Sequence, residues 1–174
     1  MKQSIVFITG PCAAGKSTVG KLLSQHKSFE KAAFLQVDEL RRIVWQGYAP
    51  PFPETEDSRK QLKLAARAAS RIAKLYCEAG FFVFVEEVME PWLISIYEEE
   101  LEQCPQKTIC LLPTDVELLK RDRERPAAEQ MRERCLDLWK SFQEWSKKED
   151  WFVIDPTGQK PDETVEKIIS QLSL

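Results

Sequence analysis

The chain has 174 residues, the length of one ordinary domain and enough to bury a substantial core. Hydrophobic residues make up 43% and charged residues 30%, a balance typical of soluble globular proteins. The net charge of −3 argues against a broad surface for nucleic acid or anionic membrane, but it is compatible with a small basic pocket. The five cysteines form no C-x-x-C pair, and no signal peptide or membrane-length apolar run is present, so we expect a cytoplasmic protein with reduced thiols.

A glycine-rich segment near the N-terminus fits the pattern G-x-x-x-x-G-K-[S/T] at every fixed position. Its residues are Gly10, Pro11, Cys12, Ala13, Ala14, Gly15, Lys16 and Ser17, followed by Thr18. An apolar, β-branched run over 4–9 precedes the segment, and Val19, Leu22 and Leu23 recur after it at helical spacing. Strand, glycine-rich loop and helix in this order indicate a phosphate-binding P-loop.

The residue types in this loop suit the binding of a nucleoside triphosphate. Glycines let the backbone curl so that successive N–H groups form an anion nest at a helix N-terminus. Lys16 can then reach the β- and γ-phosphates, and the Ser17 hydroxyl can ligate Mg²⁺. We therefore expect ATP and Mg²⁺ as cofactors, with residues 10–18 binding the nucleotide. Cys12 is either a reactive thiol or a small filler, and we interpret it as a filler.

The rest of the chain alternates strand-like apolar runs with helical patterns, which predicts a parallel α/β sheet in one domain. Further strands are predicted over 33–37, 81–85, 107–112 and 151–155. Helices are predicted over about 39–46, from a capping box at Ser58–Gln61 to Gly80, and from Pro91 to about 103. Another is predicted from a capping box at Thr114–Glu117 into 121–126, a further one from there to about 148, and the last from Pro161. Three prolines within 47–53 exclude regular structure there and indicate a pocket wall or a stiff connector.

Charged side chains follow two predicted strands at their carboxyl ends, where ligands bind in open α/β sheets. After the second strand, Asp38 is either a helix N-cap or a base that accepts the proton of an attacking hydroxyl, with Arg41 holding an anionic part of the acceptor. After the third strand, either Glu86 or Glu87 could hold a magnesium-bound water or an acceptor hydroxyl. We favour Glu86 and expect Glu87 to face solvent or cap a turn. Trp45, beside the proline-rich segment, is a candidate for lining the same pocket.

Two arginines, Arg121 and Arg125, stand one helical turn apart in a charged segment that ends at Pro126. Mobile arginines can stabilise the negative charge that spreads over a migrating phosphoryl group. A helix end laced with salt bridges explains the same pattern, because acidic residues are interleaved with the arginines. The charge pattern alone leaves both interpretations open.

Together these motifs resemble the small P-loop kinases, which include shikimate kinase, gluconate kinase, chloramphenicol phosphotransferase and the kinase domain of polynucleotide kinases. The resemblance covers essentially the whole chain. It rests on the segments 10–18, 36–38, 121–126 and 155–158. It implies a P-loop NTPase fold, a three-layer α/β/α sandwich with a five-stranded parallel sheet in the order 2-3-1-4-5. It also implies an acceptor-binding region at about 38–62 and a lid at about 121–130.

The resemblance implies roles for individual residues as well. Asp38 matches the general base of chloramphenicol phosphotransferase and shikimate kinase, and the spacing Asp38-x-x-Arg41 is similar to the base and arginine of polynucleotide kinases. Arg121 and Arg125 fall where the group keeps its lid arginines. Thr157 belongs to a segment that matches the loop whose backbone holds adenine.

At two places the chain departs from members of the group. Gln36 stands where shikimate kinase has a second acid that assists magnesium, which argues against shikimate as the acceptor. The sequence Glu86-Glu87-Val88 replaces the Asp-Thr/Ala-Asn that polynucleotide kinases typically carry, which argues against a nucleic-acid acceptor.

We therefore expect an ATP- and Mg²⁺-dependent kinase that phosphorylates a hydroxyl of a small molecule, a metabolite or an antibiotic, with no nucleic acid, membrane or obligate protein partner. The expected site consists of the catalytic residues Lys16, Asp38 and Arg125, the acceptor contacts Asp38, Arg41, Trp45 and Glu86, the nucleotide contacts Arg121 and Thr157, and the metal ligand Ser17. Alternatives are a nucleotide or polynucleotide 5′-kinase, a toxin-like kinase of sugar nucleotides, and an ATP-binding regulatory switch without an acceptor. The chain has no Asn/Thr-Lys-x-Asp motif, which argues against a GTPase.

Overall fold

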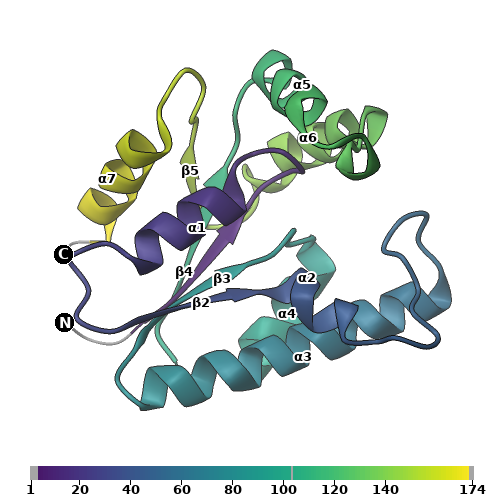
Figure 1. Cartoon of the computed structure of the whole chain (residues 1–174). Coiled ribbons are helices and arrows are strands. Elements are labelled where there is room, and N and C mark those ends of the chain that lie inside the picture. The colour runs from purple at the N-terminus through teal and green to yellow at the C-terminus, as the bar shows by residue number, and fades with distance from the viewer. Residues whose placement is uncertain (1–3, 103, 173–174) are drawn as a thin grey trace.

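Five strands form one parallel sheet in the order β2-β3-β1-β4-β5 (Figure 1) in this computed structural model, which describes residues 4–102 and 104–172. This order confirms the prediction. The strands are β1 (Ile5–Thr9), β2 (Ala32–Gln36), β3 (Phe82–Glu86), β4 (Gln106–Leu111) and β5 (Phe152–Ile154). The helices are α1 (Lys16–Ser24), α2 (Val37–Arg42), α3 (Glu56–Glu78), α4 (Pro91–Glu100), α5 (Asp115–Glu124), the 3₁₀ turn η1 (Ala127–Glu129), α6 (Glu133–Trp145) and α7 (Pro161–Gln171).

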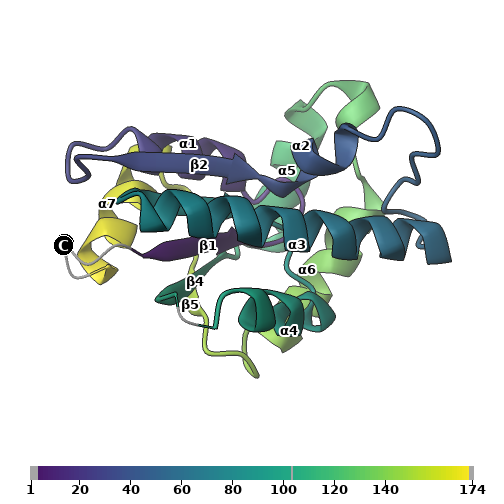
Figure 2. The same ribbon diagram turned by 90° about the horizontal axis from the view of Figure 1, so that it is seen from below.

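Alternate residues of the strands face opposite sides of the sheet and enter two separate cores. Val6 and Ile8 of β1 pack with residues of α1 and α7, whereas Ile5 and Phe7 pack with residues of α3 and α4. Strands that are apolar on both faces are characteristic of a parallel sheet between two helical layers. Figures 1 and 2 show α1 and α7 over one face of the sheet and α3 and α4 over the other. The chain is therefore the predicted three-layer sandwich.

The long helix α3 begins earlier than its predicted capping box. Thr55 is the N-cap, since its hydroxyl accepts from the backbone N–H of Ser58 at 3.1 Å and its own N–H donates to the Ser58 hydroxyl at 2.7 Å. Gln61 was expected to complete the box, but it braces the proline-rich segment instead. Its side-chain amide donates to the Gly47 carbonyl and accepts from the Ala49 N–H. The N-cap hydrogen bonds therefore join two hydroxyl residues, Thr55 and Ser58. Gln61 is left to hold the proline-rich segment in place.

Element boundaries near the carboxyl edge of the sheet also differ by a few residues from prediction. β2 ends at Gln36, and α2 takes Asp38 into its first turn. α2 ends at Arg42 rather than near residue 46, because the β-branched residues 43–44 and the glycine at 47 favour non-helical structure. α4 ends at Glu100; the predicted end at residue 103 lies outside the described residues.

Two helices were predicted between Thr114 and about residue 148, and the structure has both, α5 and α6. α5 ends at Glu124, and η1 and a short connection separate it from α6. Asp122 is buried, and its carboxylate accepts from the backbone N–H groups of Met131 at 3.0 Å and Arg132 at 2.7 Å. The connection therefore folds back onto α5, since a buried carboxylate must find donors.

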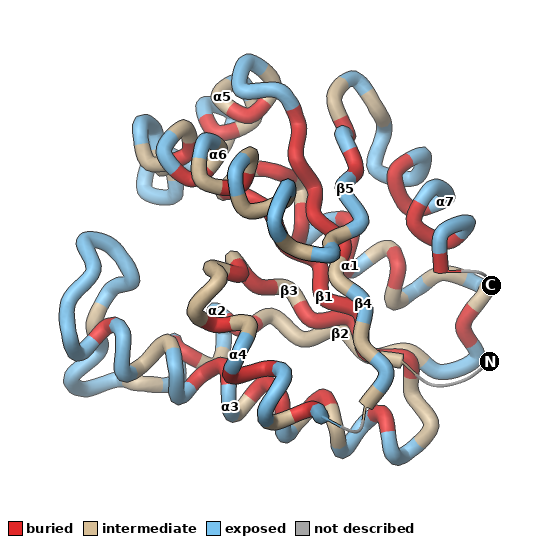
Figure 3. The backbone as a smooth tube through the Cα atoms, turned by 180° about the vertical axis from the view of Figure 1, so that it is seen from behind, coloured by how far each residue is buried: buried red, intermediate tan, exposed pale blue. Residues whose placement is uncertain are grey.

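Burial is concentrated in β1, β3, the second half of β4 and the sheet-facing sides of the helices, whereas the connection between α2 and α3 is mostly exposed (Figure 3). Among the described residues, no helix has both the length and the apolar character needed to cross a lipid bilayer.

Candidate active site

The P-loop wraps around the N-terminus of α1. Gly10 and Gly15 have φ angles of 142° and 96°, values that residues with a Cβ rarely adopt, and a Cβ at Gly10 would collide with the Leu111 carbonyl oxygen. Lys16 is mostly buried, and its ammonium donates to the Pro11 carbonyl at 2.9 Å. The loop thus presents backbone N–H groups and one ammonium at a helix N-terminus, which is a site for phosphate.

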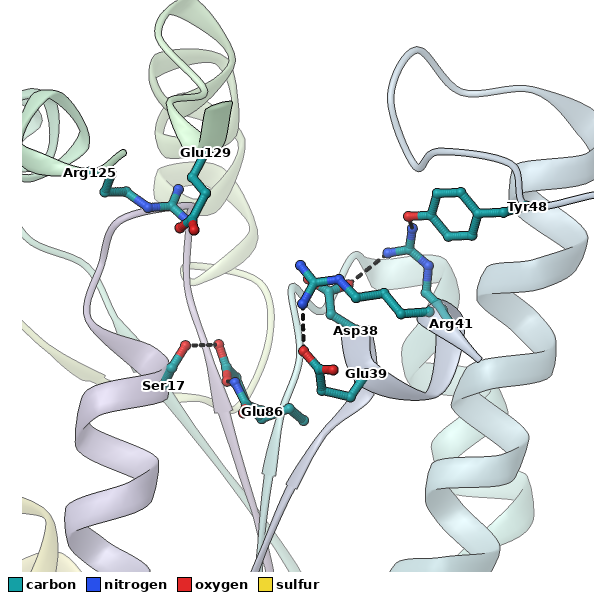
Figure 4. Close-up of polar contacts among 10 residues, drawn as sticks. Ser17, Asp38, Glu39, Arg41, Tyr48, Glu86, Arg125 and Glu129 are labelled. Atoms are coloured by element: carbon teal, nitrogen blue, oxygen red, sulfur yellow. Dashed lines mark hydrogen bonds and ion pairs between the residues drawn. The ribbon is translucent and has the colours of Figure 1, made fainter. Parts of the chain in front are cut away.

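Glu86 faces the P-loop across the carboxyl ends of β1 and β3. The Ser17 hydroxyl donates to one of its carboxylate oxygens at 2.7 Å, and the Gln36 side-chain amide donates to the other at 2.7 Å (Figure 4). Serine and carboxylate oxygens are the ligands that Mg²⁺ prefers. No group of three His, Cys, Asp or Glu in the described residues could hold a metal alone, so phosphates and water would complete the coordination. These residues fit Mg²⁺ bound together with a nucleotide.

Glu87 was expected to face solvent or to cap a turn. Instead of facing solvent it is buried, and its oxygens accept from the Tyr97 hydroxyl at 3.0 Å and the Val88 N–H at 3.0 Å. Burial, followed by the nearby carboxylate of Asp38, raises the pKa of Glu87 to about 8. Glu87 therefore carries a proton at neutral pH. Successive side chains of an extended strand point to opposite faces, so Glu86 points toward α1 and Glu87 toward α4. This opposition could have been predicted from the sequence of the strand.

Asp38 and Arg41 form an ion pair on α2. The buried guanidinium of Arg41 donates to the Asp38 carboxylate at 2.7 Å and to the Tyr48 hydroxyl at 3.3 Å (Figure 4). The Asp38 side chain is 61% exposed, and both residues line the cavity described below. Arg41 was expected to hold an anionic part of the acceptor, but the structure shows its guanidinium engaged with Asp38 and Tyr48. It orients the carboxylate.

Trp45 does not lie where the sequence interpretation placed it. Its side chain is 95% exposed, and it is not among the described residues that line the cavity. The early end of α2 leaves Trp45 on the outside of the connection to α3. Tyr48 and Phe52 line the cavity instead, and the guanidinium of Arg134 stacks over the Phe52 ring at 4.7 Å from its centroid.

Arg121 joins three segments on the other side of the P-loop. Its guanidinium donates to the carbonyls of Ala14 at 3.3 Å and Pro156 at 2.9 Å and to the Glu117 carboxylate at 2.8 Å. The Thr157 hydroxyl accepts from the backbone N–H of Thr114 at 2.8 Å, so the loop after β5 is fixed to the start of α5. Arg121 lines the cavity, whereas Thr157 fixes the loop beside it.

Arg125 ends α5 and also lines the cavity. Its guanidinium lies 3.7 Å from the Asp122 carboxylate and 3.4 Å from the Glu129 carboxylate, and its side chain is about one-third exposed (Figure 4). Both partners belong to the segment expected to form the lid. The arginine is therefore held at the rim, across the cavity from Asp38.

These elements surround one cavity of about 900 Å³. The P-loop and the two α5 arginines line one half; α2, the connection between α2 and α3, and the residues after β3 line the other. Tyr48 and Phe52 belong to the predicted acceptor-binding region, whereas several other lining residues were not predicted, among them Glu90, Trp92, Met131 and Arg134. A signal existed for two of them, because Glu90 and Trp92 follow closely after β3. Arg134 gave none, since helix α6 is brought to the site only by the folded connection after α5.

The Cys12 thiol in the P-loop faces a strongly polar environment. Its hydrogen bond with the Cys135 thiol, followed by the positive charges of Lys16, Arg125 and Arg134, lowers the pKa of Cys12 to about 6 against the opposing effect of burial. A small filler was expected at this position. The lowered pKa favours the alternative interpretation, a reactive thiol.

No protein-family model matches the chain, and no curated protein sequence matches it. Its fold matches several solved structures. A sugar kinase from a Janibacter species superposes with a TM-score of 0.71 at 15% identity, over 98% of this chain and 95% of that one. Shikimate kinase from Acinetobacter baumannii in complex with shikimate gives 0.65 at 17% identity, over 98% and 93%. An APS kinase from Mycobacterium tuberculosis in complex with AMPPNP and APS gives 0.67 at 16% identity, over 99% of both chains. The chain therefore has the fold of the small P-loop kinases, as its motifs predicted.

Proposed function

We propose that the protein is an ATP-dependent phosphotransferase that moves the γ-phosphoryl group of ATP to a hydroxyl of a small molecule. The observation that carries the proposal is the arrangement of one cavity, with the P-loop in one half and the exposed Asp38 carboxylate in the other. Similarity of fold to solved kinases, one of them bound to AMPPNP and APS, supports it. A P-loop alone would suit a switch protein equally well.

The donor half has groups for the phosphates of a bound nucleotide and for its metal ion. Lys16 and the loop amides would bind the β- and γ-phosphates, and Ser17 and Glu86 would hold Mg²⁺. When bound, this ion offsets charge on the two phosphates. Arg125, held at the rim by carboxylates of its own segment, would turn to the migrating phosphoryl group. Arg121 would maintain the P-loop geometry, because its guanidinium is already bonded to Ala14 and Pro156.

The acceptor half supplies the base. The acceptor oxygen would form a bond to the γ-phosphorus while the bond from that phosphorus to the bridging oxygen breaks and ADP leaves. The hydroxyl proton would pass to Asp38, which Arg41 holds in place. Closure of the 121–130 segment over the cavity would exclude water and limit ATP hydrolysis.

Incubation of the protein with γ-labelled ATP, Mg²⁺ and a small-molecule extract tests the proposal. We expect a new labelled organic product, separable by chromatography, and none with Lys16→Ala. Label that appears only as free phosphate would contradict the transferase and favour the nucleotide switch. Label on oligonucleotide ends would instead establish a polynucleotide kinase.

A further inference from the structure

The cations of the acceptor half already have carboxylate partners. Arg41 pairs with Asp38 at 2.7 Å, and Arg42 pairs with Glu39 on the same helix. All four residues line the cavity. Because each guanidinium is engaged within α2, neither adds a free positive charge to the space in which an acceptor would lie.

Arg134, the third arginine of this half, is partnered on two sides. It lies 4.0 Å from the Glu90 carboxylate and stacks on the Phe52 ring. Glu90 is itself fixed, since it accepts from the Trp92 indole N–H at 3.0 Å. The arrangement joins α6 to the residues after β3 and to the proline-rich connection. It places an arginine in the cavity without leaving its charge unmatched.

The fourth carboxyl of this half is Glu87, and it has no arginine of its own. Its carboxyl group is buried and accepts from the Tyr97 hydroxyl and the Val88 N–H. The three arginines (41, 42 and 134) therefore each face a carboxylate of the same half (38, 39 and 90).

The other lining residues of the acceptor half are aromatic and aliphatic. They include Tyr48, Phe52, Leu62, Trp92 and Leu93. A charged ligand that enters such a site loses its hydration without gaining a counter-charge, which is costly. An uncharged ligand with a flat or apolar face can instead pack on the rings while its hydroxyls bond to the polar groups.

We propose that the acceptor is an uncharged hydroxyl compound with a ring or another apolar face, rather than a carboxylate, a phosphate ester or an amine. This rests on the proposed function, since it specifies the substrate class of the same site. The charge of the acceptor is set by the pairing of Arg41, Arg42 and Arg134 with carboxylates of the cavity.

Separating the extract by charge tests this directly. A small-molecule extract is passed over anion and cation exchangers at pH 7, and the neutral flow-through, the anionic eluate and the cationic eluate are each incubated with γ-labelled ATP and Mg²⁺. We expect labelled product from the flow-through alone. Product from either eluate alone would overturn the inference while leaving the kinase established. Absence of product from all three would overturn the proposed function as well.

A single substitution sharpens the test. Glu90→Gln removes the charge that faces Arg134 but keeps an oxygen for the Trp92 indole, so it should open the site to anions. The Arg134 guanidinium, no longer facing a carboxylate, could then form a charged hydrogen bond with an anionic acceptor. We therefore expect label transfer to the anionic eluate to rise by about tenfold. Glu144→Gln, at an exposed ion pair on α6, is the matched control and should change nothing. If Glu90→Gln retains transfer to the neutral fraction but gains none with anions, charge pairing at Arg134 does not select the acceptor.

Discussion

The two halves of the cavity differ in what holds their positive charges. In the donor half, the Lys16 ammonium is bonded to a backbone carbonyl, whereas Arg121 is bonded to two carbonyls and one carboxylate and Arg125 lies between two carboxylates. In the acceptor half, each lining arginine faces a carboxylate. A carbonyl orients a cation without cancelling its charge, whereas a carboxylate cancels it. The Lys16 charge therefore remains available to a polyanion, whereas the arginine charges of the acceptor half are already matched by carboxylates.

Lys16→Ala should have the largest effect, because it removes a positive charge whose hydrogen-bond partner is a backbone carbonyl rather than a carboxylate. Since losing one preorganised charged donor costs up to about a thousandfold in rate, we expect a loss of that order in phosphoryl transfer. Steady-state ADP formation measures it, with Lys21→Ala on the exposed side of α1 as the control. Near-normal turnover by the Lys16 variant would show that the positive charge of Lys16 does not set the donor half apart from the acceptor half.

Asp38→Asn probes the acceptor half. Removal of a general base should lower the transfer rate by about a hundredfold or more while leaving nucleotide affinity unchanged. The rate is measured with labelled ATP and the affinity by calorimetry, with Asp57→Asn at the exposed start of α3 as the control. A matched fall in ATP affinity would assign Asp38 to the donor half.

The Cys12 thiol reports on its hydrogen bond with Cys135 and on the positive charge around the P-loop. Because its pKa is about 6, alkylation by iodoacetamide should rise with pH around that value, reach a plateau above pH 7 and slow when ATP is bound. Mass spectrometry of labelled peptides measures it. Cys110, whose pKa burial raises to about 12, should stay unmodified throughout. A rise in Cys12 labelling only above pH 8 would contradict the electrostatic account.

Glu87 should affect stability more than transfer. Its folded pKa is raised, so the neutral side chain stabilises the fold fully below about pH 4.5, and this contribution is lost as the pH rises through about 8. The free energy of unfolding, from urea titrations at pH 5.5 and 8.5, should therefore fall with pH. Glu87→Gln should lose most of this dependence, whereas Glu99→Gln, at an exposed site on α4, should keep it. An unchanged slope in Glu87→Gln would show that another group is responsible.

The fold and the donor half could be predicted well from the sequence because their signals are local. The P-loop is contiguous, and the apolar runs of the strands sit between helical patterns, so the sheet and the carboxyl edge follow from them. Asp38, Glu86 and the P-loop meet because the ends of parallel strands share one edge of the sheet.

The acceptor half was harder to predict because its residues come from separate segments whose positions depend on packing. Trp45 was selected as an aromatic beside a proline-rich stretch, but its side chain is 95% exposed, and Tyr48 and Phe52 line the cavity instead. Arg134 is positioned by the connection after α5, which the buried carboxylate of Asp122 holds against that helix. The burial of Glu87 depends on Tyr97, contributed by α4. None of these contacts follows a fixed spacing that could be recognised in the sequence.

The most direct test of the central claim is the stoichiometry of the reaction. The wild-type protein is incubated with γ-labelled ATP, Mg²⁺ and the neutral fraction, and ADP, labelled organic product and free phosphate are counted together, with Asp38→Asn measured in parallel. We predict one labelled product for each ADP from the wild type and almost none from Asp38→Asn, although the variant still binds ATP. ADP matched by free phosphate, at a rate that Asp38→Asn leaves unchanged, would show that the second half of the cavity is not an acceptor site.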